Sequence, residues 1–264
     1  MRILVTNDDG IESPGIHALA GALERAGHDV LVVSPREDMS GVGAAIGRVR
    51  ADQHIDTLPA TIPDAAGVRA YSFAGPPGLA VMAGCLEAFG PAPDVVVSGI
   101  NAGPNLGHAC LHSGTVGAAL TASTFGVSAL AVSSDVSDPM RWQTACDTID
   151  EPLRLLTDLP EGTVLNLNVP AVPRGQVRDL RWATLDRFGR VRLALAASSD
   201  EWLQMEYRDT TTELDPDCDT ALLEQGYATL TALQGLSAIP PERLTEQGEP
   251  AIGRPQGVVT DVPD

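Results

Sequence analysis

Lysine is absent from this sequence, and its absence excludes several common phosphate-handling sites. A phosphate-binding P-loop needs a Gly-Lys-Ser/Thr segment, and a phospho-acceptor receiver domain needs a lysine late in its chain. Phosphatases of the haloacid dehalogenase class are disfavoured as well, because they usually need a lysine. They also need an Asp-x-Asp pattern, which Asn7-Asp8-Asp9 does not supply.

Positive charge of any kind is scarce. The chain has 17 basic and 35 acidic residues among its 264, and its formal net charge is −18. This charge argues against a nucleic acid duplex or an anionic membrane surface as a partner. An anionic substrate would need a metal ion or well-aimed backbone N–H groups to hold it.

Paired cysteines and long apolar runs are also missing. The four cysteines lie far apart without a Cys-x-x-Cys segment, so they fit neither a zinc cage nor a dense disulfide framework. Free thiols are typical of a reducing compartment. No apolar run approaches a transmembrane span, and the N-terminus lacks the apolar core of a signal peptide. We therefore expect a cytoplasmic protein.

The chain does contain a regular alternation of strands and helices up to about Pro170. Ile3 to Val5 form a short apolar run that is typical of a strand buried on both faces of a parallel sheet. A helix follows, with Ser13 as its candidate N-cap. Further strands are predicted at 30–33, 94–98, 127–133 and 164–169, and helices at 78–89, 116–124 and 141–156. We expect an α/β fold, with a Rossmann-like, mostly parallel sheet flanked by helices.

The remaining stretches have weaker patterns. Residues 34–67 and 99–107 are predicted to be loops, the first with room for a short hairpin. After residue 170, strands at 178–184 and 191–196 flank a turn at 187–190. A helix is predicted at 219–225 and a strand at 227–233.

These patterns predict a single α/β domain at residues 1–244. Its core would cover about 1–170, and a C-terminal extension about 171–244 would carry a β-hairpin arm for oligomer contacts. Residues 245–264 show little periodicity and are predicted to be a flexible tail.

Oxygen-bearing side chains follow three of the predicted strands. Asp8 and Asp9 come directly after the first strand. Ser40 follows the second, and Asn101 and Asn105 follow the third. Because the carboxyl ends of parallel strands open on one edge of a sheet, these loops are expected to meet. Carboxylate, hydroxyl and amide oxygens suit Mg²⁺ or Mn²⁺ better than zinc or copper.

Ser113-Gly114-Thr115 opens the next predicted helix. The N–H groups and the dipole at a helix N-terminus favour a phosphate, and Gly114 would allow its close approach. Each residue also has a simpler explanation, such as a turn hydroxyl for Ser40, a tight-loop position for Asn101 and an N-cap for Ser113. Their joint placement after successive strands favours a site for phosphoryl chemistry.

Several long motifs follow one another in the order of a known family. They are Asn7-Asp8-Asp9-Gly10-Ile11, Pro14-Gly15-Ile16, Ser40-Gly41, the stretches 96–107 and 113–119, Asn166-Leu167-Asn168-Val169-Pro170 and Gly226-Tyr227. In these motifs the chain resembles the SurE survival-protein family of metal-dependent nucleotidases. The resemblance covers about residues 1–235.

The resemblance implies a Rossmann-like fold whose C-terminal arm forms a homodimer or homotetramer. It also implies hydrolysis of a small phosphorylated substrate, a nucleoside 5′- or 3′-monophosphate, to nucleoside and inorganic phosphate. One divalent cation per subunit, Mg²⁺ or Mn²⁺, would be bound by Asp8, Asp9, Ser40 and Asn101. The phosphate would be faced by Asn105, Ser113, Gly114 and Thr115. Asp8 and Asp9 are the predicted catalytic residues, and which of them orients or deprotonates water, or attacks directly, is left open.

The chain departs from the family pattern around this site. Ala44 stands where the family commonly has a histidine, and Gly75 to Ala80 replace the usual Gly-Thr-Pro-x-Asp-Cys segment. His108-Ala109 replace an acidic pair, and His108 or His112 is a candidate proton donor. Two alternatives stay open. One is the same chemistry on a non-nucleotide metabolite, such as a sugar phosphate or biosynthetic intermediate. The other is a paralogue that binds metal and phosphate with little turnover.

Overall fold

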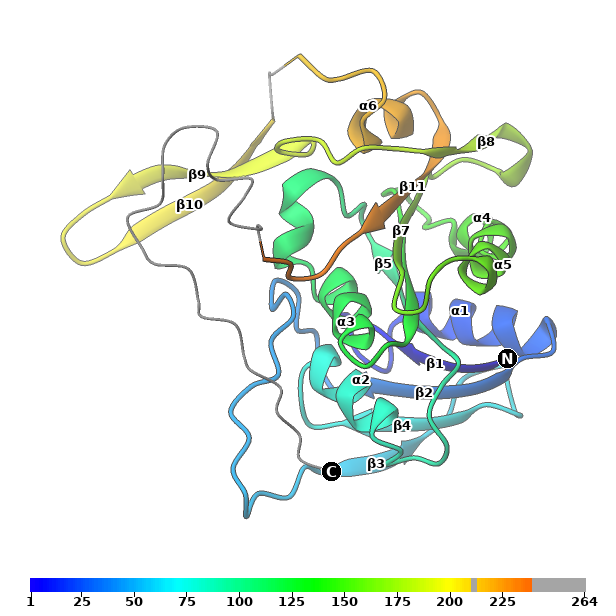
Figure 1. Ribbon diagram of the computed structural model, residues 1–264. Coiled ribbons are helices and arrows are strands. Elements are labelled where there is room, and N and C mark those ends of the chain that lie inside the picture. Colours follow the sequence, from blue (N-terminus) through cyan, green and yellow to red (C-terminus); the bar gives the residue numbers. More distant parts are fainter. Residues whose placement is uncertain (210–212, 239–264) are drawn as a thin grey trace, which may run out of the picture. The chain divides into compact units, whose positions relative to one another are not determined.

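The computed structural model describes residues 1–209 and 213–238, which contain both strands and helices (Figure 1). Within that part, the strands are β1 (Arg2–Thr6), β2 (Asp29–Pro35), β3 (Thr57–Ala60), β4 (Arg69–Phe73), β5 (Val95–Ala102), β6 (Ser128–Ser134), β7 (Val164–Val169), β8 (Arg178–Trp182), β9 (Val191–Ser198), β10 (Leu203–Asp209) and β11 (Tyr227–Leu233). The helices are α1 (Pro14–Arg25), α2 (Pro77–Cys85), α3 (Gly114–Ser123), α4 (Trp142–Cys146), α5 (Asp150–Asp158) and α6 (Asp219–Glu224). Two short 3₁₀ helices are η1 (Gly107–His112) and η2 (Arg174–Gln176).

A mixed sheet forms the centre of the described residues. Its nine strands lie in the order β3-β4-β2-β1-β5-β6-β7-β11-β8. Neighbouring strands from β4 to β7 in this order are parallel. β3 and β11 pair antiparallel with β4 and β7, and β8 lies parallel to β11 at the edge. The predicted mostly parallel sheet is confirmed.

Helices cover both faces of this sheet (Figure 1). α1, α4 and α5 pack against one face, in an apolar layer with Ile3 and Val5 of β1. α2 and α3 cover the other face, in a layer with Leu4 of β1 and Val96 of β5. Alternate residues of β1 thus enter two separate layers, as expected for a strand buried on both faces. None of the helices in the described part of the chain is long and apolar enough to cross a membrane.

Local sequence fixes the position of α1, the first predicted helix. Ser13 Oγ accepts a hydrogen bond from the N–H of Ile16 at 3.5 Å, as predicted for the N-cap. Gly27, with φ of +84°, lies just beyond the end of the helix. Leu19 and Leu23 are fully buried. Because burying a leucine side chain contributes about 2 kcal/mol, this apolar face holds α1 against the sheet.

The structure corrects several predicted boundaries. The loop predicted at 99–107 is wrong in its first part, because β5 continues to Ala102. After an irregularity that follows Ser98, Asn101 and Ala102 pair with Ser133 and Ser134 of β6. The helix predicted at 141–156 is divided into α4 and α5.

Two further boundaries differ. The helix predicted at 78–89 ends at Cys85, and Glu87 and Gly90 just after it adopt positive φ values. The stretch at 34–67, predicted as a loop with room for a short hairpin, contains β3, which pairs antiparallel with the next strand, β4, and β4 is not among the predicted strands.

The predicted hairpin, in which the strands at 178–184 and 191–196 pair around the turn at 187–190, is wrong. β9 pairs antiparallel with β10, whereas β8 pairs with β11 in the large sheet. Arg178 and Arg181 of β8 each place the guanidinium group over the ring of Tyr227 in β11, 4.3 and 4.4 Å from its centre. These contacts join segments far apart in the sequence, so the local pattern of β8 does not show them.

Residues Met1–Gln234 form one compact unit, which includes the part of the predicted C-terminal extension up to β11. The chain from Gly235 belongs to a second unit, of which the structure describes residues 235–238. The predicted domain end at residue 244 and the predicted flexible tail at 245–264 lie outside the described residues.

The four cysteines are free thiols, as predicted. Cys110, Cys146 and Cys218 are buried, and Cys85 is half-buried. Burial raises the pKa of Cys110 to about 12 and the pKa of Cys85 and Cys146 to about 11. The cytoplasmic location inferred from these thiols stays a prediction.

We expect the native protein to react slowly with Ellman's reagent at pH 8. The thiolate is the reactive form, and the raised pKa values keep its population small. Titration in guanidinium chloride, where the burial is lost, should detect all four thiols quickly. Rapid stoichiometric reaction of the native protein would contradict this expectation.

Candidate functional site

The loop that follows β1 is fixed before any ligand is considered. Asn7 is fully buried, and its Nδ2 donates to Gly10 O at 3.2 Å and to Ser13 Oγ at 2.7 Å. Its Oδ1 accepts a hydrogen bond from Ser34 Oγ of β2. One side chain therefore ties the end of β1 to the start of α1 and to the neighbouring strand. Asp8 and Asp9 follow on this fixed loop.

Asp8 is held by the N-terminus of α3. Its side chain is buried, Gly114 N donates to its Oδ2 at 3.0 Å, and Thr115 Oγ1 donates to its Oδ1. Burial raises the pKa of Asp8, and these two hydrogen bonds oppose the rise because they favour the carboxylate. A Cβ at Gly114 would lie only 2.6 Å from Asp8 Cβ. The close approach of α3 to Asp8 therefore requires glycine.

Asp9 lies beside Asp8 in a different environment. Its Oδ2 is buried and has no hydrogen-bond partner among the described residues. Burial, and then the charges of Asp8 and Asp38, raise the pKa of Asp9 to about 6. A buried carboxylate oxygen without a donor is costly, and a cation bound to it would remove that cost.

Ser40 lies on the loop after β2, close to Asp8 in the fold. Met39 N donates to Asp8 O at 2.7 Å, which brings this loop to the end of β1. Ser40 Oγ and Ser40 N both donate to Asp38 Oδ1, at 2.6 and 2.8 Å, and these bonds lower the pKa of Asp38. The hydroxyl proton is thus directed to Asp38, which leaves the oxygen lone pairs of Ser40 for a cation.

Asn101 reaches the same region from the end of β5. Thr115 Oγ1 lies 3.5 Å from Asn101 Oδ1, and Asn101 Nδ2 donates to Gly103 O at 2.6 Å. The amide nitrogen is therefore turned to the backbone, and the amide oxygen is turned toward Thr115. The structure thus brings Asp8, Gly114, Thr115 and Asn101 together.

Asn105 and Ser113 flank η1. Asn105 Nδ2 donates to Ser133 Oγ at 2.8 Å, and Ser113 Oγ accepts a hydrogen bond from Val116 N at 3.1 Å as the N-cap of α3. Their contact with a phosphate stays a prediction. His108 and His112 lie on η1 with exposed side chains, and their role as proton donors stays a prediction as well.

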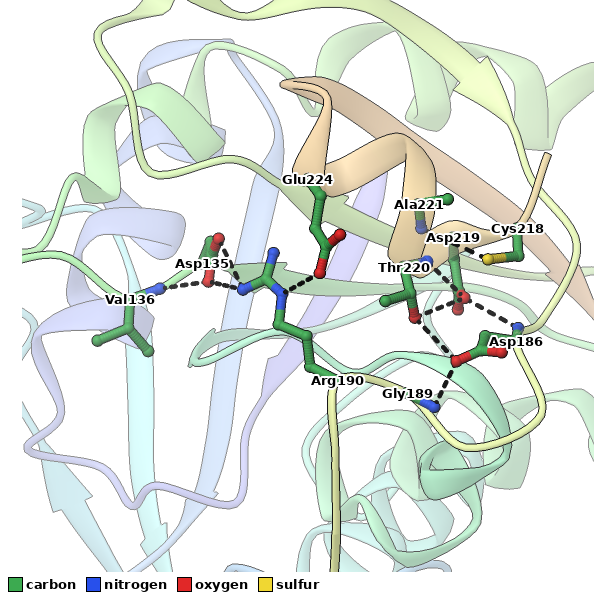
Figure 2. A network of polar contacts seen from close by, with 10 residues as sticks. All are labelled: Asp135, Val136, Asp186, Gly189, Arg190, Cys218, Asp219, Thr220, Ala221 and Glu224. Carbon is green, nitrogen blue, oxygen red and sulfur yellow. Dashed lines mark hydrogen bonds and ion pairs between the residues drawn. The ribbon is translucent and has the colours of Figure 1, made fainter. Parts of the chain in front are cut away.

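A polar network anchors the start of η1, and its part around Asp186 and Asp219 is shown in Figure 2. Asp219 Oδ2 accepts a hydrogen bond from Gly107 N at 2.8 Å. Asp219 Oδ1 accepts bonds from the backbone of Asp186 and Thr220 at 3.0 and 2.8 Å. Asp186 Oδ2 in turn accepts a bond from Gly189 N at 2.8 Å. This network joins the loop before η1 to α6 and to the segment that leads into β9.

The donor set suits a hard divalent cation. In residues 1–209 and 213–238, no group of three or more His, Cys, Asp or Glu side chains is placed to hold a metal ion. A cation here would depend on two carboxylates supplemented by hydroxyl and amide oxygens, a set that Mg²⁺ and Mn²⁺ accept with water. The buried Oδ2 of Asp9 is the observation that favours such an ion.

Two features of the site are absent from the sequence prediction. Asp38 orients Ser40. The sequence has an aspartate two residues before a serine here, and this spacing is typical of a turn that an aspartate side chain closes. Asn166 and Asn168 hold the backbone of Asn105. The signal there was a pair of alternating amides in an otherwise apolar strand.

Comparison with known proteins adds a second line of support. Residues 3–190 match the family model described as survival protein SurE. The chain is 36% identical over 245 residues to the 5′-nucleotidase SurE of Gloeobacter violaceus, covering 89% of this chain and 90% of the relative. It is 38% identical over 242 residues to the 5′/3′-nucleotidase SurE of Serratia proteamaculans, with coverage of 89% and 90%.

A solved structure has a similar fold. The crystal structure of the SurE protein from Aquifex aeolicus aligns with a TM-score of 0.75 and 25% sequence identity, and the alignment covers 93% of this chain and 97% of that one. This similarity extends beyond the residues matched by the family model.

We expect Gly114→Ala to weaken metal binding. The added methyl group would meet Asp8 Cβ, Oδ2 and Cγ at 2.6 to 2.9 Å, so Asp8 must move. Loss of the residues that support a metal ligand typically lowers metal affinity about ten- to hundredfold, and we expect a loss of this size for the predicted ligand Asp8, to be measured by titration calorimetry with Mn²⁺.

Gly175→Ala is the matched control for this variant. A Cβ at Gly175 would meet no atom within 4 Å, and the residue is exposed. The control should bind Mn²⁺ as the parent protein does. Equal Mn²⁺ affinity in Gly114→Ala and Gly175→Ala would contradict the prediction that Asp8 is a metal ligand.

Proposed function

The chain belongs to the SurE family, and we propose on this basis that it is a phosphoric monoester hydrolase acting on nucleoside monophosphates. It would convert nucleoside 5′- or 3′-monophosphates to nucleoside and inorganic phosphate. The proposal is supported by relatives that carry nucleotidase names and match 89% of this chain. The structural observation that carries it is the contact between Asp8 and the N-terminus of α3, beside Asp9 Oδ2, which has no hydrogen-bond partner in the described part of the chain.

The proposal includes one divalent cation per subunit, Mg²⁺ or Mn²⁺. Asp8, Asp9, Ser40 and Asn101 are the residues that would hold it. When bound, the ion would neutralise phosphate charge and polarise the phosphorus.

Asp8 and Asp9 are suited to different tasks. Both oxygens of Asp8 already accept hydrogen bonds from Gly114 and Thr115, so this side chain is rigid. Asp9 Oδ2 accepts none among the described residues, so it is the oxygen that remains for the cation. Asp8 would thus fix the geometry of the site, and Asp9 would complete the ligands of the cation.

The N-terminus of α3 would hold the phosphate. In the structure, the Gly114 N–H and the Thr115 hydroxyl donate hydrogen bonds to Asp8. They would therefore affect a phosphate partly by holding Asp8 in place. Ser113 lies one residue earlier at the N-cap, where the helix dipole favours an anion. Asn105 would approach the same group from the loop before η1.

Two of the three segments that depart from the family pattern, at Ala44 and at Gly75 to Ala80, lie against each other. A Cβ at Gly78 would be 3.0 Å from Ala45 O and 3.6 Å from Ala44 O. The surface formed by Ala44, Ala45 and Gly78 is where we expect the preference for the base or the sugar of the substrate to differ from that of the relatives. The alternatives of a non-nucleotide substrate and of binding without turnover are not favoured, because the relatives are named as nucleotidases.

We expect release of inorganic phosphate from one or more nucleoside monophosphates with Mg²⁺ or Mn²⁺, and its loss in EDTA. Asp9→Asn and Asp8→Asn should each lower kcat by roughly a hundredfold or more, because each removes a negative charge that would hold the cation. Each change alters the side-chain volume little, so the fold should be retained. A colorimetric phosphate assay on a panel of mononucleotides and sugar phosphates measures both effects.

Asp179→Asn is the matched control, since Asp179 is an exposed residue of β8 and the change is chemically the same. It should retain full activity. Release from sugar phosphates alone would support the metabolite alternative. Full activity of both site variants would reject the assigned site.

We further propose that the β9–β10 hairpin contacts a second copy of this chain. Leu193 pairs with Tyr207 and Leu195 with Met205 across the hairpin, so these four apolar side chains share one face. Their exposed fractions are 56%, 76%, 52% and 47%. The opposite face carries Gln204 and an ion pair between Glu206 and Arg208.

Arg190, just before β9, is bonded to the residue after β6 and to α6, as Figure 2 shows. Arg190 donates to Asp135 Oδ1 and Oδ2 at 2.9 and 3.1 Å, and its Nε lies 3.5 Å from Glu224 Oε1. A fixed arm with one apolar face suits a homodimer or homotetramer, because covering an exposed apolar patch is favourable.

We expect Leu195→Glu to lower the oligomeric state, because it places a charge in the middle of the apolar face. Sedimentation velocity should show a dimer or tetramer for the parent protein and a smaller species for the variant. Gln204→Glu adds the same carboxylate to the polar face and should leave the oligomer intact. A monomeric parent protein, or equal sedimentation of the two variants, would contradict the proposal.

A further inference from the structure

Both the N–H and the carbonyl oxygen of Asn105 are hydrogen-bonded to side chains of β7. Its N–H donates to Asn168 Oδ1 at 2.7 Å, and its carbonyl oxygen accepts a bond from Asn168 Nδ2 at 3.0 Å. Asn166 Nδ2 donates to the same carbonyl oxygen at 2.8 Å. Both asparagines are fully buried. The side-chain amide of Asn168 thus pairs with the backbone of Asn105 much as a neighbouring strand would.

Strand register places these contacts in one group. β6 and β7 are parallel, with Ser133 opposite Asn168 and Ala131 opposite Asn166. Ser133 Oγ accepts a hydrogen bond from Asn105 Nδ2 at 2.8 Å. β7 therefore holds the backbone of Asn105, while β6 orients its side chain.

Packing of the core does not explain these two amides. The other residues of β7 are Val164, Leu165, Leu167 and Val169, and all are buried. Burying an amide costs free energy unless its hydrogen bonds are replaced, and Asn166 Oδ1 has no partner among the described residues. A leucine of similar size would avoid that cost. The two amides are explained by their hydrogen bonds to the backbone of Asn105.

The loop is also fixed beyond Asn105. Gly107 N donates to Asp219 Oδ2 at 2.8 Å, within the network that Figure 2 shows in part. The carbonyl oxygen of Asn105 also accepts a hydrogen bond from Cys110 Sγ at 3.2 Å. The segment is therefore immobilised around Asn105, while the N-cap Ser113 follows only a few residues later.

We propose that Asn166 and Asn168 are positioning residues that fix Asn105 to bind the phosphate of the substrate. The inference rests on the proposed function, which assigns Asn105 to the phosphate. Correct geometry at a reacting group is worth large factors in rate, so a support of this kind matters although it does not touch the substrate.

Asn168→Asp is the most direct test. It keeps an acceptor for Asn105 N but directs a carboxylate oxygen at Asn105 O in place of the amide donor. We expect inorganic phosphate to bind the Mn²⁺-loaded protein about tenfold or more weakly in calorimetry. KM for the best mononucleotide should rise, and hydrogen exchange should accelerate in peptides that cover 103–112. Mn²⁺ affinity should stay unchanged, because the proposed ligands are not altered.

Thr229→Val is the matched control. Thr229 lies opposite Asn168 in β11, is fully buried, and has a hydroxyl without a partner among the described residues. Its replacement should leave phosphate binding and hydrogen exchange at 103–112 unchanged. Asn166→Leu is a second variant in case Asn168→Asp does not fold. It removes one donor to Asn105 O and should weaken phosphate binding by roughly threefold with Tm retained.

The outcomes separate this inference from the proposed function. Unchanged phosphate affinity in a folded Asn168→Asp or Asn166→Leu protein would overturn it, even if hydrogen exchange accelerates. An equal loss of phosphate binding in Thr229→Val would overturn it too, since the effect would then be general. Failure of the parent protein to hydrolyse any mononucleotide, with phosphate binding still dependent on Asn168, would reject the proposed activity alone.

Discussion

The bond between the Asp8 carboxylate and the N-terminus of α3 is the constraint on which the site depends. Adjacent carboxylates at the end of a strand repel each other, and burial makes their charge more costly still. The N–H of Gly114 and the hydroxyl of Thr115 offset part of that cost at Asp8, while one oxygen of Asp9 finds no hydrogen-bond partner within residues 1–209 and 213–238. The result is a rigid carboxylate next to one that remains available to a ligand.

Small residues make this arrangement sterically possible. A Cβ at Gly117 would lie 2.3 Å from Gly43 C, and one at Gly114 would lie 2.7 Å from Asp8 Oδ2. α3 can therefore contact two loops at backbone distance, the one after β1 and the one after β2. The latter carries Ser40, so a helix rich in glycine and alanine brings the proposed ligands within reach of each other. Larger side chains would separate the loops.

Sequence patterns predict the parts of this structure that depend on local chemistry. The Ser13 cap, the strand at 164–169 and the placement of Asp8 after the first strand follow from residue types and the geometry of parallel sheets, whereas the bonds from Gly114 and Thr115 to Asp8 do not. The partner of β8 and the continuation of β5 depend on contacts between segments far apart in the sequence. The same reason explains why the roles of Asn166 and Asn168 were missed, since both are defined by a loop some sixty residues away in the sequence.

The N-terminus of α3 at Asp8 can attract a phosphate only over a short distance. A phosphate ester approaches a molecule of formal net charge −18, so the long-range field opposes the encounter. The dipole of a helix fades beyond its first turn, and physiological salt screens charges over about 8 Å. Capture is therefore a matter of fit at contact distance, and raising the ionic strength eases the approach of an anion instead of hindering it.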